Sequence, residues 1–463
     1  MSKLRGRALE DEFCGIVREL GGDAEGRAAG DAYLEASHPI VEHDGTSTWA
    51  LTPKVLGTAE IEILTEAAET MGRILEKVTK RYLVDPDLRA LFGLDPRAEE
   101  LTLIPTGYEQ VIPFARLDVL FNEEIGDFAF AGVSTDSAVG TTVSVDVTRA
   151  IQRTESYRRF AERHRSIETF DIADGMIAAL RETYQSWANA DAGTHHPERP
   201  VVGIVDYAES ASEGEFADLI ERMADEGVFA RFVDIRDLRI EEAAGTRRLV
   251  DSQGPIACVY RRALVGEMIE KPCEGVDALV EATRRGLACV IGGFRTWPAS
   301  VNSLFAVLHS EAVESILDPI ELAFVRAHVP EAHVLTRDSD INRYLSEQDD
   351  WLVRPAGPYR APETVAGVDR MDRDEWWRVL LAACEEGATI VRRDPAYRTP
   401  VILGGATPRP DGSDPAEPIE ANNLLGLFLF RGKFGGVYAR CAYEGVMGEW
   451  GHRLDMGCLV VNE

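Results

Sequence analysis

Arg116 and Asp118 stand one residue apart in FARLDVLFN, an apolar run that is typical of a β-strand. Alternate residues of a strand point to the same face of a sheet, so the guanidinium and the carboxylate are expected side by side. Such a pair can bind an anionic group or contribute oxygen to a divalent cation. An ordinary surface ion pair is the other interpretation, and the surrounding residues have to decide between the two.

Three further arginines and one further aspartate stand near the ends of predicted strands. Arg354 ends the apolar run WLVR, just before Pro355, and Arg393 follows TIVR in TIVRRDP. Arg440 lies in GGVYARCAYEG, and Asp136 lies in STDSAVG. Arginine suits phosphate and carboxylate groups because its N–H donors form a planar fork. Only six of the 49 basic residues are lysines, so an arginine where other proteins use lysine is unsurprising here.

The stretch WLVRPAGPYRAPETVAGVD, residues 351–369, predicts a strand, a loop and a second short strand. Enzymes that hold a nucleotide triphosphate under a flap often use this outline, with a lysine on the first strand and glycines in the loop. Glycines let backbone N–H groups approach phosphates, whereas prolines carry no N–H. Here the cation is Arg354, and the loop contains Pro358 and Pro362. We expect a modified phosphate grip, with a relic of one as the alternative.

The pattern of the rest of the chain predicts helices and strands in alternation. Apolar residues recur every three or four positions from Ala59 to Val78, which indicates an amphipathic helix. The runs VVGIVDY, VFARFVDI and IACVYRR, with a helix from Glu213 to Glu226 opened by a Ser212–Glu215 capping box, predict a βαβ unit and a parallel sheet. LLGLFLFRGKFGGVYARCAYEG predicts a C-terminal hairpin. The fold class is therefore α/β, and α+β in parts.

Four ranges of the chain follow from this pattern. The segment ANADAGTHHPERP breaks all periodicity and is the best candidate for a linker. The ranges are 1–100, an N-terminal helical section; 101–187, a strand pair and helix with the R-x-D and STDS segments; 201–300, the βαβ subdomain; and 301–463, the strand-loop-strand and the C-terminal strands.

The composition excludes several kinds of partner. A net charge of −30 over 463 residues argues against nucleic acid and an anionic membrane surface, because both are bound through clustered lysines and arginines. The seven cysteines form no C-x-x-C pair, so neither a zinc site nor a disulfide framework is expected. No apolar run follows the charged start MSKLRGRALEDEF, and none is long enough to span a bilayer. We expect a cytoplasmic protein, and the sequence gives no oligomeric state.

The order of the fragments carries a family resemblance. Arg116-Leu-Asp118 and STDSAVG are followed by VYRRAL, VNSLFAVLHSE, VRAHVPEAHVL, the 351–369 stretch and GGVYARCAYEG. In this order the chain resembles the circularly permuted ATP-grasp proteins, the group that includes glutathionylspermidine synthase. The similarity runs from about Ile104 to the C-terminus. It implies a circularly permuted, multi-subdomain ATP-grasp-like architecture with the βαβ unit in its middle.

The resemblance implies an ATP-dependent carboxylate–amine ligase, with ATP and Mg²⁺ as cofactors and a small carboxylate and an amine as substrates. ATP phosphorylates the carboxylate, and the amine then displaces phosphate from the acyl phosphate to leave an amide. Such transfer depends on metal ions and cations around the phosphate oxygens. Arg116 would stabilise the transferring group and Arg440 would face the reacting carboxylate. Arg354 and Arg393 would contact the nucleotide, and Asp118 would bind the metal.

The chain departs from the family pattern at the metal site. The family's Glu-x-Asn-x-Asp-Ser, whose Glu and Asn bind metal, is Gly132-Val-Ser134-Thr-Asp136-Ser here. Two oxygen ligands of the usual kind are absent, so Asp136 would have to join Asp118 as a second metal ligand. Ser303 also stands where the family has a lysine.

These departures leave three functions open. The first is an active amide-forming ligase, which the retained Arg116, Asp118 and Arg440 favour. The second is a non-catalytic ATP-grasp relative, a binding or partner subunit that kept the cleft and lost the metal. The third is a metal-independent transferase that takes a pre-activated substrate. The absent Glu and Asn favour the second and third, and we take the ligase as the leading hypothesis.

Overall fold

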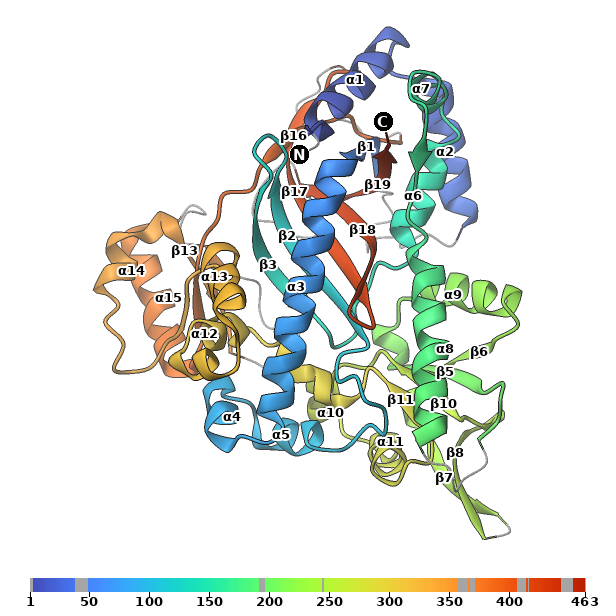
Figure 1. Cartoon of the computed structure of the whole chain (residues 1–463), viewed down its shortest axis with the longest axis vertical. Coiled ribbons are helices and arrows are strands. Elements are labelled where there is room, and N and C mark those ends of the chain that lie inside the picture. The colour runs from blue at the N-terminus through green and yellow to red at the C-terminus, as the bar shows by residue number, and fades with distance from the viewer. Residues whose placement is uncertain are drawn as a thin grey trace.

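One large mixed sheet of eight strands forms the centre of the molecule (Figure 1). The computed structural model describes residues 3–37, 49–190, 196–243, 245–356, 365–366, 371–405, 414, 416–442 and 453–462. The strands in spatial order are β1 (Trp49–Gly57), β19 (Arg453–Val461), β18 (Lys433–Ala442), β17 (Ile419–Phe430), β2 (Phe114–Asn122) and β3 (Asp127–Ser134), with β16 (Arg398–Val401) beside β17 and β4 (Ile167–Glu168) beside β19. β1 and β19 are parallel, and the other pairs are antiparallel.

Helices cover both faces of this sheet because side chains alternate along its central strands. Leu117 and Val119 of β2 pack in one core with the long helix α3, which crosses the sheet in Figure 1. Arg116 and Asp118 alternate with these two residues and so point to the opposite face, where Tyr438 packs in a second core. The helices around the sheet are α3 (Thr58–Tyr82), α1 (Gly6–Glu19), α2 (Ala24–Ala36), α6 (Val143–Ile151), α7 (Glu155–Ala161) and α8 (Ile172–Ala190).

A second sheet of four parallel strands confirms the predicted βαβ unit. Its spatial order is β11, β10, β5, β6, and α9 connects the last two. Ser212 precedes α9 as predicted but makes no capping hydrogen bond, and Glu215 turns to another loop. The predicted capping box is therefore wrong, because this carboxylate serves tertiary contacts. The elements are β5 (Val201–Asp206), α9 (Glu213–Asp225), β6 (Phe229–Asp234), β10 (Cys258–Arg261), α10 (Val265–Glu270), α11 (Glu274–Arg285) and β11 (Cys289–Ile291), with a small sheet of β7 (Arg239–Ala243), β8 (Thr246–Asp251) and β9 (Gly254–Pro255).

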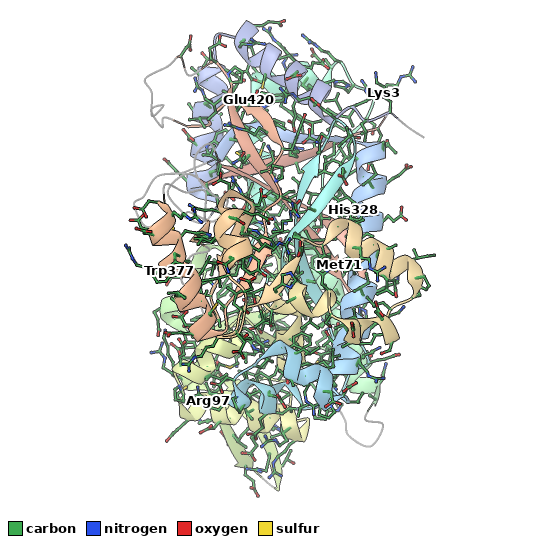
Figure 2. The ribbon with its side chains drawn as sticks, turned by 90° about the vertical axis from the view of Figure 1, so that its left-hand side faces the viewer. Lys3, Met71, Arg97, His328, Trp377 and Glu420 are labelled. Carbon is green, nitrogen blue, oxygen red and sulfur yellow. The ribbon has the colours of Figure 1, made fainter. Side chains whose placement is uncertain are left out.

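A small antiparallel sheet contains both strands predicted for residues 351–369. β13 pairs with β14, and the loop residues Pro358 and Pro362 between them lie outside the described residues. α15 packs on this sheet and buries Trp376, whereas Trp377 is exposed on the outer side of the helix (Figure 2). The elements are β12 (Ala332–Val334), α14 (Asn342–Ser346), β13 (Trp351–Arg354), β14 (Val365–Ala366), α15 (Arg373–Glu386) and β15 (Thr389–Arg392).

Strands from the N-terminal and the C-terminal parts of the chain pair with each other in the large sheet. β1 lies within the predicted helical section 1–100 and pairs with the C-terminal strand β19, so that section is not helical alone. The predicted C-terminal hairpin is confirmed as β17 and β18, and β17 also pairs with β2. Ranges 1–100, 101–187 and 301–463 therefore share one sheet, and the boundaries between them stay predictions. The remaining helices are α4 (Pro86–Phe92), α5 (Pro96–Thr102), α12 (Leu304–Leu308) and α13 (Pro319–His328), with short 3₁₀ turns η1 (Ala208–Ser210), η2 (Ile235–Asp237), η3 (Phe294–Ser300), η4 (Glu311–Ser315) and η5 (Gln348–Asp350).

The cysteines pack as small apolar side chains. Six of the seven are buried, and none forms a disulfide. Burial raises the pKa of Cys14 to about 12, so its thiol is protonated at neutral pH. Within the described ranges, no helix combines the length and the apolar character needed to cross a membrane.

Lys54 joins separate parts of the chain inside the large sheet. Its ammonium group is fully buried and contacts Glu10 of α1 at 3.0 Å, the carboxylate of Glu123 and the side-chain oxygen of Asn423 at 3.3 Å. A buried charge loses its hydration, and only close partners of opposite charge offset that loss. The lysine therefore holds α1 against β1 and β17.

Lys54→Met should lower the free energy of unfolding by about 3–5 kcal/mol, because it leaves two buried glutamates without their cation. Urea unfolding followed by circular dichroism measures this loss. Lys80→Met is the matched control, since Lys80 contacts Glu76 at the surface and should contribute little. Equal losses in the two variants would contradict the role given to Lys54.

Candidate functional site

The candidate site lies on the face of the large sheet opposite α3. The strand register places Gly132, Asp118, Gly426 and Tyr438 in one row across β3, β2, β17 and β18. Residues paired across antiparallel strands point to the same face. A glycine stands on each side of Asp118, so longer side chains from neighbouring rows have room to reach its carboxylate.

Asp118 accepts hydrogen bonds from two arginines. Arg116 donates from Nε to Oδ1 at 2.9 Å and from Nη2 to Oδ2 at 3.1 Å, and Arg440 donates from Nη2 to Oδ1 at 2.6 Å. Burial alone would raise the pKa of Asp118, but the charges of Arg116 and Arg440 outweigh it and hold the pKa below its usual value. The carboxylate is ionised at neutral pH, and this triad of two arginines and one aspartate has one positive charge in excess.

Gly426 makes room for the triad. A Cβ atom at this position would lie 2.8 Å from Arg116 Cδ and 3.2 Å from Asp118 Oδ1. Any side chain at position 426 would therefore displace the arginine. Both guanidinium groups also approach the Tyr438 ring, with Cζ 5.8 Å from its centroid for Arg116 and 4.9 Å for Arg440.

The loop after β3 fixes Arg116 from a second direction, and Asp136 fixes that loop. Arg116 Nη1 donates to the Val139 carbonyl at 2.7 Å. The buried carboxylate of Asp136 accepts hydrogen bonds from the Arg261 guanidinium and, at 2.9 Å, from the Val265 amide. Both oxygens of Asp136 are thus engaged away from Asp118, so the structure does not bring the two predicted metal ligands together.

Glu215 holds the far end of the same loop. One carboxylate oxygen accepts from the amides of Gly140 and Thr141 at 3.0 Å each, and from Thr141 Oγ1 at 2.7 Å. Arg262 contacts the other oxygen at 3.2 Å. Burial raises the pKa of Glu215, but Arg262 and the Thr141 donors outweigh it and lower the pKa. The parallel sheet therefore positions the loop that orients Arg116.

A cavity of about 670 Å³ opens beside Asp118, between the large sheet and β13 of the small sheet. This size falls in the range of small-molecule sites. Three of the predicted arginines line it, and Arg116 is hydrogen-bonded to Asp118, another lining residue. The charged lining residues are Asp118, Arg354, Arg393, Asp394, Arg398 and Arg440.

Arg354 spans this cavity from the small sheet to the large one. Its Nη2 donates to the Ala131 carbonyl of β3 at 2.6 Å, and its Cζ lies 5.4 Å from the Phe305 ring centroid. Burial lowers the pKa of Arg354 to about 10, and the nearby charge of Asp118 opposes the shift. The guanidinium stays charged at neutral pH. Arg393 is exposed at the rim, where its amide donates to the Asp350 carbonyl.

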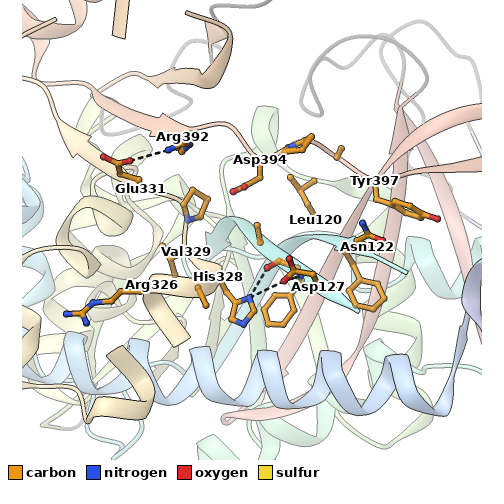
Figure 3. Close-up of a pocket in the computed structure, with 17 residues that line it drawn as sticks. Leu120, Asn122, Asp127, Arg326, His328, Val329, Glu331, Arg392, Asp394 and Tyr397 are labelled. Atoms are coloured by element: carbon orange, nitrogen blue, oxygen red, sulfur yellow. Dashed lines mark hydrogen bonds and ion pairs between the residues drawn. The ribbon is translucent and has the colours of Figure 1, made fainter. Parts of the chain in front are cut away.

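A second cavity of about 510 Å³ adjoins the first (Figure 3). Both cavities are lined by Leu120 and by residues 394–396, so they lie side by side along the segment after β15 and are together called the cleft. Rings line part of its wall, where His328 stacks on Phe128 with 3.9 Å between the ring centroids.

The second cavity is acidic where the first is basic. Its two arginines, Arg326 and Arg392, are each paired with a glutamate. Asp127 and Asp394 enter the cavity from different elements, β3 and the segment after β15 (Figure 3). Burial raises the pKa of Asp394; Arg392 opposes that rise and the charge of Asp127 adds to it. The cleft thus has charges of opposite sign at its two ends.

The side chains around Asp118 do not offer the ligands that a resident Mg²⁺ needs. A hard dication takes oxygen ligands, commonly carboxylates, and the oxygens of Asp118 are shared with two guanidinium groups. Gly132 faces Asp118 without a side chain, and Ser134 offers one hydroxyl. Among the described residues, no three His, Cys, Asp or Glu side chains are grouped to hold a metal.

Sequence reasoning missed two contributors to the site. Gly426 interrupts the apolar run LLGLFLF, and an isolated glycine inside a strand is a known signal of close approach by another group. Asp394 follows the arginines of TIVRRDP and lines both cavities, but its position depends on how the two sheets meet. Local sequence carries no signal for that.

Comparisons with solved structures place the fold among known architectures. A glutathione synthetase like-effector (GSS30) from Globodera pallida, in its apo form, matches with a TM-score of 0.61 and 12% identity, over 94% of this chain and 96% of that one. A putative gamma-glutamylcysteine synthetase from Methylobacillus flagellatus KT matches with a TM-score of 0.39 and 11% identity, over 83% and 84%. A RimK domain protein ATP-grasp from Sphaerobacter thermophilus DSM 20745 matches with a TM-score of 0.26 and 16% identity, over 56% and 90%. No family model and no curated protein sequence matches the chain.

The likeness to the Globodera pallida protein covers nearly the whole of both chains and confirms the predicted mixed α/β, multi-sheet fold. At 12% identity it concerns the fold alone. The circular permutation and the likeness to glutathionylspermidine synthase stay predictions.

Asp118→Asn should destabilise the protein by about 3 kcal/mol at pH 7, because it leaves two buried guanidinium groups without a counter-ion. The pKa of Asp118 is lower in the folded state, so its contribution is complete above the unfolded-state pKa of about 4 and is lost as the pH falls below it. The gap between wild type and variant should stay constant from pH 7 to about 5 and narrow at lower pH. Urea unfolding at several pH values measures it.

Asp95→Asn is the control, because Asp95 pairs with Arg97 at the surface and an asparagine can still cap α5. This variant should unfold close to wild type at pH 7. A stable Asp118→Asn protein would show that the two arginines do not depend on the carboxylate.

Proposed function

We propose that the protein is an ATP-dependent ligase that joins a small carboxylate to an amine. The observation that carries the proposal is the convergence of arginines from distant parts of the chain on one cavity. Arg354, Arg393 and Arg440 line it, and Arg116 is hydrogen-bonded to Asp118, which also lines it. In a protein of net charge −30, such a cluster marks a site for an anionic ligand.

The proposed reaction has two steps. A carboxylate oxygen attacks the γ-phosphorus of ATP, the bond to the β-phosphate oxygen breaks, and an acyl phosphate and ADP form. The amine nitrogen then attacks the acyl carbon, phosphate leaves with the electron pair of the C–O bond, and the amine gives up a proton. Both steps concentrate negative charge on oxygen, which arginine side chains can stabilise.

Each arginine has a separate part in this proposal. Arg354 and Arg393, on the side of the small sheet, would contact the phosphates of ATP. Arg116 and Arg440, on the large sheet, would hold the reacting carboxylate and the transferring phosphoryl group. Any magnesium would arrive with the nucleotide as the counter-ion of its phosphates.

The acidic cavity gives the amine a place next to the acyl phosphate. Alkylamines are cations at neutral pH, and Asp127 and Asp394 would attract them to this end of the cleft. Asp394 lines both cavities and so stands where the amine would pass from one to the other. We include this path in the proposed function.

A non-catalytic binding protein is the second candidate. Gly132 and Ser134 favour it, because the positions that hold metal in the family have lost those ligands. A metal-independent transferase with a pre-activated substrate has the same support. Each would keep the anion site and form no ADP.

Trapping with hydroxylamine tests the ligase before its substrates are known. Hydroxylamine attacks acyl phosphates to give hydroxamates, which ferric ion detects by colour. The purified protein, supplied with ATP and mixtures of small carboxylates, should form ADP, phosphate and hydroxamate in equal amounts. ATP binding in calorimetry without ADP in any mixture would leave the binding protein as the function.

Arg354→Ala should weaken ATP binding about ten- to a hundredfold, since charge-assisted contacts to phosphate contribute roughly 1.5–3 kcal/mol each. Isothermal titration calorimetry measures the affinity. Arg285→Ala, which removes an exposed arginine of α11, is the matched control for lost charge. If both variants bind ATP as wild type does, Arg354 does not belong to the nucleotide site.

Asp394→Asn should raise the KM for n-butylamine about tenfold, while the rate with hydroxylamine stays the same. The reason is charge: n-butylamine is a cation at pH 7.5 and hydroxylamine is neutral, so only the first depends on the acidic cavity. ADP release at a fixed carboxylate concentration gives both rates. Glu100→Gln, which removes an exposed acid of α5 outside both cavities, is the control. Equal effects on the two nucleophiles would remove Asp394 from the amine path.

A further inference from the structure

The space beside Asp118 is open where a metal-binding protein would place oxygen ligands. Gly132 pairs with Asp118 across β2 and β3, and a Cβ atom built at Gly132 would find its nearest neighbour, Asp118 Oδ2, 3.9 Å away. Ser134 pairs with Arg116 rather than with Asp118. Both Gly132 and Ser134 line the cavity, so this free space is open to a ligand.

Arg440 has a buried donor directed to no acceptor. The residue is 8% exposed, its Nη2 donates to Asp118, and its Nε is buried without a hydrogen-bond partner. A buried N–H group without an acceptor destabilises the protein that contains it. Arg440 also lines the cavity, so its guanidinium group borders the space that an oxyanion would occupy.

The charge around this space favours an anion over a dication. Four arginines line the cavity against two aspartates, and Arg116 adds a fifth positive charge behind Asp118. A divalent cation at Asp118 would lie next to two guanidinium groups that already share that carboxylate. Repulsion from both would oppose its binding.

We infer that Arg440, held by Asp118 and backed by the charge of Arg116, binds an oxyanion directly, and that this guanidinium pair stands in place of a resident divalent cation. The ligand is a carboxylate or a terminal phosphate that enters the gap at Gly132. Asp118 orients the two arginines and does not hold a metal. The inference deepens the proposed function, since the guanidinium groups would supply the neutralisation that metal ions supply elsewhere.

Calorimetry with inorganic pyrophosphate and with butyrate, in EDTA and in Mg²⁺, tests the inference. At least one of the two anions should bind in EDTA, and the pair distinguishes a phosphate site from a carboxylate site. Arg440→Lys should weaken that binding about tenfold, because lysine keeps the charge and loses the fork of donors. Arg285→Lys is the matched control. Binding of both anions only in the presence of Mg²⁺, or no binding in either buffer, would overturn the inference.

Asp118→Asn separates the two roles of the carboxylate by the effect of Mg²⁺ on pyrophosphate binding. If Asp118 only holds the arginines, replacing EDTA by Mg²⁺ should change the affinity by the same factor in wild type and in the variant. If Asp118 were a metal ligand, Mg²⁺ would strengthen binding in wild type alone. If Asp118→Asn is unfolded at the assay temperature, two other measurements decide whether Asp118 holds a metal. These are anion binding by Arg440→Lys and the binding of Mn²⁺ by the wild-type protein, described next.

Electron paramagnetic resonance of Mn²⁺ gives a readout that needs no anion. Wild type should leave added Mn²⁺ free in solution. The double variant Gly132→Glu, Ser134→Asn supplies two oxygen ligands facing Asp118 and Arg116 and should bind about one Mn²⁺ per chain. Val84→Glu, at a position 76% exposed, adds the same charge elsewhere and should bind none. Stoichiometric Mn²⁺ binding by wild type would overturn the inference.

None of these measurements involves turnover. If no anion binds in EDTA but hydroxamate still forms, the protein is a ligase that depends on a metal. Oxyanion binding in EDTA without hydroxamate would keep the guanidinium site and remove the ligase.

Discussion

The shared carboxylate of Asp118 is the interaction on which the rest of the site depends. Two buried guanidinium groups repel each other, so they can lie close together on one face of a sheet when a negative charge lies between them. The neighbouring strand must also leave space for their side chains. Gly426 provides that room, and the hydrogen bond from Arg116 to the Val139 carbonyl sets the remaining direction of the side chain. The loop that contains Val139 is in turn fixed by buried acids, so the parallel sheet and the large sheet jointly determine where one guanidinium points.

The distribution of charge explains how an acidic protein can present an anion site. With a net charge of −30, the surface repels anions at long range, and only a local concentration of arginine reverses the field. In the proposed anion site the buried arginines of the cleft would do this, because low polarity around them strengthens each interaction. The neighbouring cavity has the opposite sign because each of its arginines is paired with a glutamate, and two aspartates add negative charge: Asp394, and Asp127, which lies 3.9 Å from the ring of His328. One cleft can therefore hold an anion and a cation close together.

Much of this architecture could be predicted from the sequence, for reasons that differ between elements. The period of two in FARLDVLFN placed Arg116 and Asp118 on one face, and the apolar periodicity of 59–78 gave α3. β1 was not found, because all nine of its residues are buried and it lacks the alternation that marks a half-exposed strand. The capping box at Ser212 failed because Glu215 meets a loop about 75 residues away in the chain, and local spacing contains no such contact.

Asp136 shows the same limit at the site itself. Its place after β3 suggested a ligand near Asp118, and the register does bring that segment close. The side chain turns instead toward Arg261, about 125 residues further along the chain, because that buried cation needs a counter-ion. A motif match fixes the position of a residue along the backbone, and the nearest unpaired charge in the fold then decides what the side chain contacts.

The excess positive charge of the triad also has a consequence for the stability of the unliganded protein. Two buried guanidinium groups against one carboxylate leave a charge with too little solvation, and the unpaired Arg440 Nε adds a missing hydrogen bond. A fold that bears this cost is stabilised by whatever anion neutralises it, because a ligand that binds only the folded state shifts the unfolding equilibrium in proportion to its affinity. The same feature that makes the site weakly stable alone would therefore favour the proposed oxyanion. A metal ion would add to the excess charge, whereas a carboxylate or phosphate removes it.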